Sequence, residues 1–381
     1  MASGKNRRDY SLTGPEGKRA LEKGLVAAEW YTSPIPRQRL KELMKRKDGP
    51  AIRDTIIWFG GLAVLGYLAY LSWGTWWALP AFLAYGILYA TPADSRWHEC
   101  GHGTAFRTPW MNEAIYQIAS FMFLRSATPF RWSHTRHHTD TIIVGRDPEI
   151  VAERPPIWRI IMMEIFHLYG GPKEIKRYFL HAFGVIDKEE KEYIPASEYR
   201  KVFWEARVYL LILGSVAAWC IAIGSILPAM FIGFPSLYGA VIVLLTGLSQ
   251  HLGLREDVLD HRLNSRTIYM NPIMRFLYWN MNYHIEHHMF PMVPYHALPA
   301  LHKEMKSDCP APSPSFPAAL KEVFSLLLKQ KRDPSFALVR PLPPTARPYK
   351  FDAQTAPAAG AQTAPAAGAQ TNAGSGTVEA S

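Results

Sequence analysis

Two long stretches without a charged side chain limit what this sequence can fold into. The first runs for 37 residues from Thr55 to Thr91, and the second runs for 43 residues from Val208 to Gln250. A membrane-crossing helix needs about 20 apolar residues, so each stretch has the length of two helices joined by a turn. Buried helices of water-soluble domains rarely lack charge over such lengths. The sequence therefore predicts an all-α integral membrane protein with four transmembrane helices in two hairpins.

The two stretches also predict which parts of the chain share one side of the membrane. We expect the first hairpin to turn near Gly74 and the second to be interrupted by Pro228 and Pro235. Each hairpin returns the chain to the side that it left. Lys and Arg crowd the first 53 residues, and basic residues beside a span normally stay in the cytoplasm. Both termini, residues 92–206 and everything after His251 are therefore predicted to be cytoplasmic.

The basic N-terminal region has an alternative interpretation, an arm that binds nucleic acid. The formal net charge of the chain is +10. No module that reads nucleic acid follows the basic residues, whereas apolar sequence follows them at once. We therefore predict a membrane as the partner of this region, and no nucleic acid.

Composition divides the chain into four regions. An Ala/Pro/Gly-rich repeat, AQTAPAAG, occupies residues 353–360 and again 361–368, and such sequence cannot bury a core. Two apolar stretches, Ala114 to Phe123 and Ile157 to Tyr169, are too short to span a membrane and predict helices that lie at the membrane interface or in a cytoplasmic cap. The predicted regions are a basic cytoplasmic segment at 1–54, a catalytic membrane domain at 55–310, a cytoplasmic segment at 311–350 and a disordered tail, dispensable for catalysis, at 351–381.

Eight of the 14 histidines fall into three short clusters. These are His98 and His102 in HECGH, His134, His137 and His138 in HTRHH, and His284, His287 and His288 in HIEHH. On a helix, side chains three and four positions apart lie along one face, so each cluster would aim its imidazoles at a common point. This spacing is typical of metal ligands.

The clusters predict two metal ions on the cytoplasmic side. Imidazole binds iron, copper, zinc and nickel, and eight imidazoles exceed what one ion can use. The three cysteines, Cys100, Cys220 and Cys309, show no paired spacing, so a thiolate site is not expected. All three clusters lie outside the uncharged stretches, in sequence predicted to be cytoplasmic.

The histidines outside the three clusters stand singly, and most single histidines are ordinary polar residues. His251 directly follows the second uncharged stretch and is predicted as a ninth ligand, with His261 the weaker candidate because solvent can satisfy it in the charged sequence REDVLDHR. His167, His181, His296 and His302 are expected to have no metal. Acidic residues that orient ligating imidazoles are expected among Glu99, Asp140, Asp147 and Glu286.

Three motifs carry a specific resemblance to a known family. HECGHGT, HTRHHTDT followed by GRDPEI, and NYHIEHHMFP resemble the three histidine boxes of the membrane fatty-acid desaturase superfamily, and the similarity covers roughly residues 50–305. The resemblance implies a non-haem di-iron enzyme that uses dioxygen and two electrons, with no catalytic residue apart from the metal ligands. It also implies a further ligand between the fourth span and the third box, where His251 stands.

The resemblance leaves the reaction and the substrate partly open. It favours a desaturase that introduces a C=C bond into an acyl chain or a related aliphatic substrate, and the alternatives are a hydroxylase with the same metal site or a desaturase of a small amino-acid-like molecule of the dihydrorhizobitoxine type. No HPGG-like haem-binding turn is present. We therefore expect a separate electron donor, of the ferredoxin or cytochrome b5 type, with its reductase.

Two functions from other classes fit the residues less well. A metal transporter would carry its histidines inside the spans, near the middle of the membrane. A zinc hydrolase generally uses three protein ligands and an open position, far fewer than the clusters provide.

Overall fold

The computed structural model describes residues 7–350, and this part of the chain is helical, with isolated β-bridges and no strand. The all-α prediction is therefore confirmed for these residues, whereas the predicted tail at 351–381 lies outside them. The shorter α-helices are α1 (Glu16–Glu22), α2 (Arg37–Leu43), α5 (Pro109–Met122), α6 (Ala127–Thr139), α7 (Trp158–Glu164), α8 (Gly170–Ala182), α13 (His261–Asn264), α14 (Pro272–Leu277), α15 (His284–Met289), α16 (Leu298–Met305) and α17 (Phe316–Arg332). Short 3-10 helices occupy Glu190–Glu192, Ala196–Glu198 and Tyr295–Ala297.

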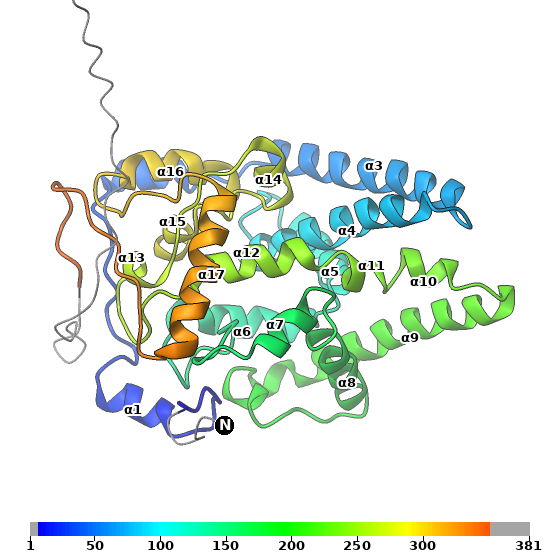
Figure 1. The fold of residues 1–381 in the computed structure, drawn as a ribbon, viewed down its shortest axis with the longest axis horizontal. Helices are drawn as coiled ribbons and strands as arrows, with labels where there is room; N and C mark the ends of the chain where they lie inside the picture. Colours follow the sequence, from blue (N-terminus) through cyan, green and yellow to red (C-terminus); the bar gives the residue numbers. More distant parts are fainter. Residues whose placement is uncertain (1–6, 351–381) are drawn as a thin grey trace, which may run out of the picture.

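The first uncharged stretch forms the predicted hairpin. Helix α3 (Asp48–Ser72) and helix α4 (Ala78–Gly101) run side by side in opposite directions (Figure 1). Gly74 lies in the turn with a φ of +84°, a left-handed conformation that glycine adopts without steric cost. Helix α4 continues beyond the uncharged stretch and carries the first histidine cluster at its end.

The second uncharged stretch differs from the prediction in its return limb. Helix α9 (Tyr199–Ile223) is long, but the chain returns through three short helices, α10 (Leu227–Phe231), α11 (Pro235–Tyr238) and α12 (Val241–His251). Pro228 and Pro235 lie in the first turns of α10 and α11, where their missing N–H groups are tolerated. Within one continuous helix they would break the hydrogen-bond ladder, so the chain starts a new helix at each proline.

The broken limb packs closely against α4. A Cβ atom on Gly239 would lie 2.0 Å from the carbonyl oxygen of Gly86, far inside van der Waals contact. Glycine at this point lets the two backbones touch. The contact brings the chain that leads into α12 alongside the helix that carries the first histidine cluster.

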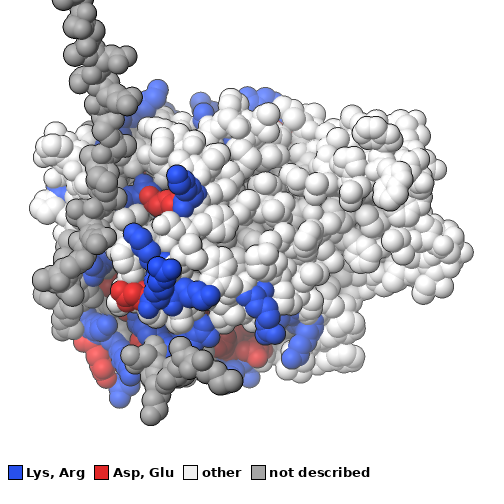
Figure 2. Space-filling view, in the orientation of Figure 1, with Lys and Arg blue, Asp and Glu red and all other residues white. Residues whose placement is uncertain are grey.

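Two helices of residues 7–350 are long and apolar enough to cross a membrane, the one that ends at Ser72 and the one that ends at Ile223. Their outer faces expose large apolar side chains, including Ile56, Leu211 and Ile221. Figure 2 shows almost no charge where α3, α4, α9 and α10 project from the molecule. Helix α4 carries charged residues in its second half, and α12 has only 11 residues.

Lys, Arg, Asp and Glu side chains gather at the opposite end of the molecule (Figure 2). This end contains α1, α6, α13, α15, α16 and α17 (Figure 1). The two short apolar stretches predicted as interfacial or cap helices contain most of α5 and α7. The molecule is thus divided into an apolar helical end and a charged helical end, and the histidine clusters lie where the two meet.

Candidate metal centre

Four helices bring nine histidines together. Helix α4 ends in the first cluster, α6 carries the second, α12 ends at His251 and α15 carries the third. The nine side chains form two groups, and within each group the ligand atoms lie within 4.8 Å of one another. Group one contains His98, His102, His134, His138 and His287, and group two contains His137, His251, His284 and His288.

The two HxxHH clusters divide between the groups in the same way. In α6, His134 and His138 belong to group one and His137 to group two. In α15, His284 and His288 belong to group two and His287 to group one. Consecutive residues of a helix are about 100° apart around its axis, whereas residues four apart nearly coincide. Each HxxHH cluster therefore aims its imidazoles at two points, and the prediction of one common point was wrong for these two clusters. His98 and His102 of the first cluster both join group one.

The Nε2 atoms of each group point at one another over short distances. In group one, the Nε2 atom of His134 lies 3.0 Å from that of His98 and 3.1 Å from those of His102 and His138. The Nε2 atoms of His98 and His287 are 2.8 Å apart. In group two, the Nε2 atom of His284 lies 2.9 Å from that of His251 and 3.0 Å from that of His288.

This spacing fits imidazoles that share one ion. A first-row divalent ion binds imidazole nitrogen at about 2.0–2.1 Å, so two nitrogens at right angles around it lie about 3.0 Å apart, and two at the tetrahedral angle about 3.4 Å apart. The observed separations of 2.8–3.2 Å match the right-angled arrangement more closely. The residues present thus fit a metal ion in each group.

Hydrogen bonding alone does not account for the arrangement. Nδ1 of His251 lies 2.8 Å from the backbone oxygen of Asn264, which can only accept, so Nδ1 carries the proton and Nε2 of the neutral ring has a lone pair. Nε2 of His134 faces three other Nε2 atoms, and one hydrogen cannot satisfy all of them. Lone pairs that face each other in a buried site require a cation between them.

Burial favours the protonation state that binds metal. Desolvation, followed by the neighbouring imidazoles, lowers the pKa of His134, His138, His287 and His288 well below the usual histidine value. These rings are therefore neutral near pH 7, which is the form that coordinates a metal ion. His137 differs, because the Asp147 carboxylate outweighs the effect of burial and raises its pKa.

Two carboxylates bond the Nδ1 atoms of candidate ligands, on the side of the ring away from the other imidazoles. Oδ2 of Asp147 lies 2.8 Å from Nδ1 of His137, and Oε2 of Glu149 lies 2.8 Å from Nδ1 of His134. A hydrogen bond at Nδ1 fixes the ring orientation and leaves Nε2 free for a metal. Asp147 was among the acids expected from the sequence and Glu149 was not. The only sequence signal for Glu149 is its place in GRDPEI, just after the second cluster.

The other three acids expected to orient ligands have different partners among the described residues. Glu99 accepts hydrogen bonds from the Thr104 hydroxyl and the Tyr295 backbone N–H. Asp140 pairs with Arg136 and Arg146. Glu286 bonds Thr267 and Nδ1 of His302, each at 2.5 Å. Glu99 and Glu286 point away from the imidazole face of their helices. They therefore join the first and third histidine clusters to neighbouring segments.

The remaining histidines lie outside both groups. His167 and His181 are buried and pair with Glu164 and Glu190. His261 was expected in solvent, but it is only 3 % exposed, and burial lowers its pKa to about 3. The segment after α12 folds back over the site, which sequence position alone does not reveal. His251 joins group two, whereas His261 belongs to neither group.

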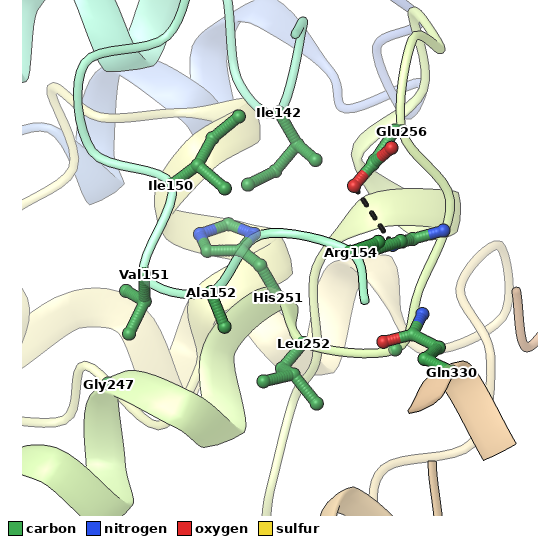
Figure 3. Close-up of a pocket in the computed structure, with 11 residues that line it drawn as sticks. Ile142, Ile150, Val151, Ala152, Arg154, Gly247, His251, Leu252, Glu256 and Gln330 are labelled. Carbon is green, nitrogen blue, oxygen red and sulfur yellow. Dashed lines mark ion pairs between the residues drawn. The ribbon is translucent and has the colours of Figure 1, made fainter. Parts of the chain in front are cut away.

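A cavity of about 380 Å³, including the open space at its mouth, lies beside group two. Figure 3 shows the His251 ring in its wall, next to Ile142 and Ile150. Val151, Ala152, Gly247 and Leu252 add to the apolar lining, and an ion pair of 2.9 Å between Arg154 and Glu256 lies at one side. Gly247 also lines the cavity, and no heavy atom would lie within 4 Å of a Cβ atom on it, so a side chain at this position would have room.

Comparison with known families gives one match over most of the chain. Residues 72–318, almost two thirds of the sequence, match the family described as fatty acid desaturase. The matched region contains all nine histidines of the two groups.

Individual relatives match over shorter regions. The chain is 25% identical over 194 residues to a Delta(12) acyl-lipid conjugase of Impatiens balsamina, which covers 48% of each protein. It is 26% identical over 117 residues to a Delta(12)-fatty-acid desaturase of Arabidopsis thaliana, covering 28% of this chain and 29% of the relative. A bifunctional fatty acid conjugase/Delta(12)-oleate desaturase of Punica granatum is 32% identical over 84 residues, covering 22% of this chain and 20% of the relative. The matches thus span half of these relatives or less.

Proposed function

Because the chain belongs to the fatty acid desaturase family, we propose that it is a membrane-bound oxidoreductase that introduces a C=C bond into an acyl chain, with two non-haem iron ions as cofactor. One observation carries the proposal: nine imidazoles from four helices form two groups with the spacing of metal ligands. A single zinc ion would leave one of the groups unused. The histidines lie where the charged end of the molecule begins, whereas a transporter would hold them in the middle of its spans.

The ligands in this proposal are the five histidines of group one and the four of group two. When bound, iron supplies the chemistry in which dioxygen, two electrons and two protons take up two hydrogens from adjacent substrate carbons and give two waters. The chain's part is to position the ligand rings and the substrate and to exclude water from the site. Asp147 and Glu149 hold His137 and His134 in orientation, and the apolar side chains around His251 reduce the contact of group two with water.

The cavity beside His251 would take an apolar part of the substrate. Its lining of Ile142, Ile150, Val151 and Leu252 suits methylene groups, and the adjoining Arg154–Glu256 pair suits a polar end. Ligand sites generally combine apolar walls with a few polar groups in this way. The size of the side chain at position 247 would then determine how much aliphatic chain fits beside the centre.

We further propose a multi-pass arrangement with α3, α4, α9 and the α10–α12 limb in the membrane and the histidines, with both termini, on the cytoplasmic side. The uncharged surface around the tips of these helices supports it (Figure 2). The basic residues just before α3 support the orientation. Electrons would come from a separate ferredoxin or cytochrome b5-type protein and its reductase.

The proposal is tested with the enzyme in native membranes, supplied with a reduced donor and a panel of acyl-lipids, acyl thioesters and small amino-acid ethers. We expect two irons per chain and an alkene product from an acyl substrate, detected by mass spectrometry. His287→Ala serves as the inactive reference, since His287 belongs to group one. An alcohol product would instead identify a hydroxylase, and one zinc with no dioxygen consumption would contradict the proposal.

A further inference from the structure

One aromatic side chain of the N-terminal segment lies over the candidate metal centre and has no role in the site described above. The indole of Trp30 stacks on the imidazole of His261, with ring centroids 4.3 Å apart and planes inclined by 6°. His261 in turn lies beside His288 of group two, with centroids 5.2 Å apart. Three rings thus follow one another from Trp30 to a candidate ligand.

The orientation of Trp30 is fixed from two sides. Its Nε1–H donates to the backbone oxygen of Thr139, directly after the second histidine cluster, at 3.1 Å. The next residue, Tyr31, donates its backbone N–H to Leu259 at 2.8 Å. Trp30 also packs against a buried apolar cluster that includes Ile143. The stack is therefore built into the fold by segments distant in sequence.

Trp30 is the point where this series of rings reaches the surface. His261 is buried, whereas Trp30 is partly exposed. Two other aromatic side chains stack on or against the candidate ligands, Trp97 and Phe130, and both are buried. Among the described tryptophan, tyrosine and phenylalanine side chains in contact with the centre, directly or through one ring, Trp30 alone is partly exposed.

We infer that electrons reach the metal centre through the Trp30–His261 stack, and that a one-electron carrier protein docks over Trp30. The inference rests on the proposed function, in which each turnover consumes two electrons that the chain does not itself hold. Two carrier molecules each lose one electron, and the pair of electrons enters the two waters formed with dioxygen, two protons and two substrate hydrogens. Electron tunnelling slows steeply with each gap between groups, and rings in contact leave the smallest gaps.

The test compares two ways of reducing the iron-loaded, full-length enzyme. Stopped-flow absorbance follows oxidation of a reduced [2Fe–2S] ferredoxin and, separately, of reduced methyl viologen, a small mediator that needs no docking surface. For Trp30→Leu we expect ferredoxin oxidation to slow several-fold or more, with viologen oxidation and iron per chain unchanged. Trp30→Phe retains a ring in the stack and should restore most of the ferredoxin rate. His261→Leu should slow ferredoxin oxidation by as much as Trp30→Leu does.

Trp110→Leu is the matched control, because Trp110 is a tryptophan that is 66% exposed on α5, a helix that carries none of the nine histidines. Its ferredoxin rate should equal that of the unmodified chain. Loss of iron or of the viologen reaction in Trp30→Leu would make Trp30 a structural cover and overturn the inference. An unchanged ferredoxin rate would also overturn it, while leaving the proposed function intact. An unmodified chain that binds no iron would overturn both.

Discussion

Oδ2 of Asp147 lies 2.8 Å from Nδ1 of His137, a residue ten positions earlier at the end of α6. The same carboxylate oxygen accepts the backbone N–H of Ile142. The loop after the second histidine cluster is therefore folded around the acid that orients one of the cluster's own rings. Glu149, two residues on, does the same for His134. One short loop thus supports a ligand candidate of each group.

Replacing Asp147 should weaken metal binding without unfolding the site. In Asp147→Asn the side chain can still accept a hydrogen bond from Ile142, but it no longer holds the His137 ring with a charge. Loss of such a supporting acid typically costs about 10 to 100-fold in metal affinity or activity. We expect a loss of this size in iron affinity, measured by chelator competition. Asp140→Asn is the control, because Asp140 pairs with Arg136 and Arg146. Equal losses in the two variants would contradict the assignment.

Removal of His251 should affect one group of ligands. Nε2 of His251 lies 2.9 Å from Nε2 of His284, so His251→Ala opens group two and leaves group one intact. We expect iron to fall from two per chain towards one and turnover to be lost. His261→Ala should retain both irons, because His261 belongs to neither group. If His261→Ala loses iron while His251→Ala keeps it, the two roles are reversed.

Filling the cavity beside His251 should change which chains are accepted. The Gly247→Phe side chain would enter the space bounded by Ile150 and Leu252 and displace the part of the substrate that lies there. We expect activity to shift towards shorter acyl chains, with iron per chain unchanged, measured by mass spectrometry of products from a chain-length series. Gly214→Phe on α9 is the control, since Gly214 also has open space around it but lies far along the chain from the cavity. An unchanged chain-length profile in Gly247→Phe would exclude this cavity as the substrate site.

The proposed topology predicts which positions react from each side of the membrane. Single cysteines at Thr135 and Met292, both exposed near the histidine clusters, should react with an impermeant reagent from the cytoplasmic side. A cysteine at Trp76, which is 93% exposed in the turn between α3 and α4, should react from the opposite side. The measurement uses oriented vesicles and a chain without its three native cysteines. Reaction of all three positions from one side would refute a membrane-crossing α3–α4 hairpin.

The sequence alone determined which segments form apolar helices and which residue type supplies the candidate metal ligands. Uncharged runs longer than one span predict membrane hairpins because charge is costly in lipid, and Gly74 marks the first turn because few other residues adopt its conformation. Histidines three and four apart predict metal ligands because a helix of fixed pitch aligns them. These inferences need only local geometry, so they can be made without knowledge of the fold.

Tertiary structure decided how the histidines divide and what supports them. Helix pitch separates His137 from His138 and His287 from His288, but the placement of α6 and α15 decides which rings of the two helices share a group. The choice of Glu149 over Asp140 depends on where the loop after α6 folds, and the burial of His261 depends on a contact with Trp30 from the far end of the chain. Such contacts join residues that are distant in sequence. Their formation depends on packing energies summed over the whole molecule, which no local pattern records.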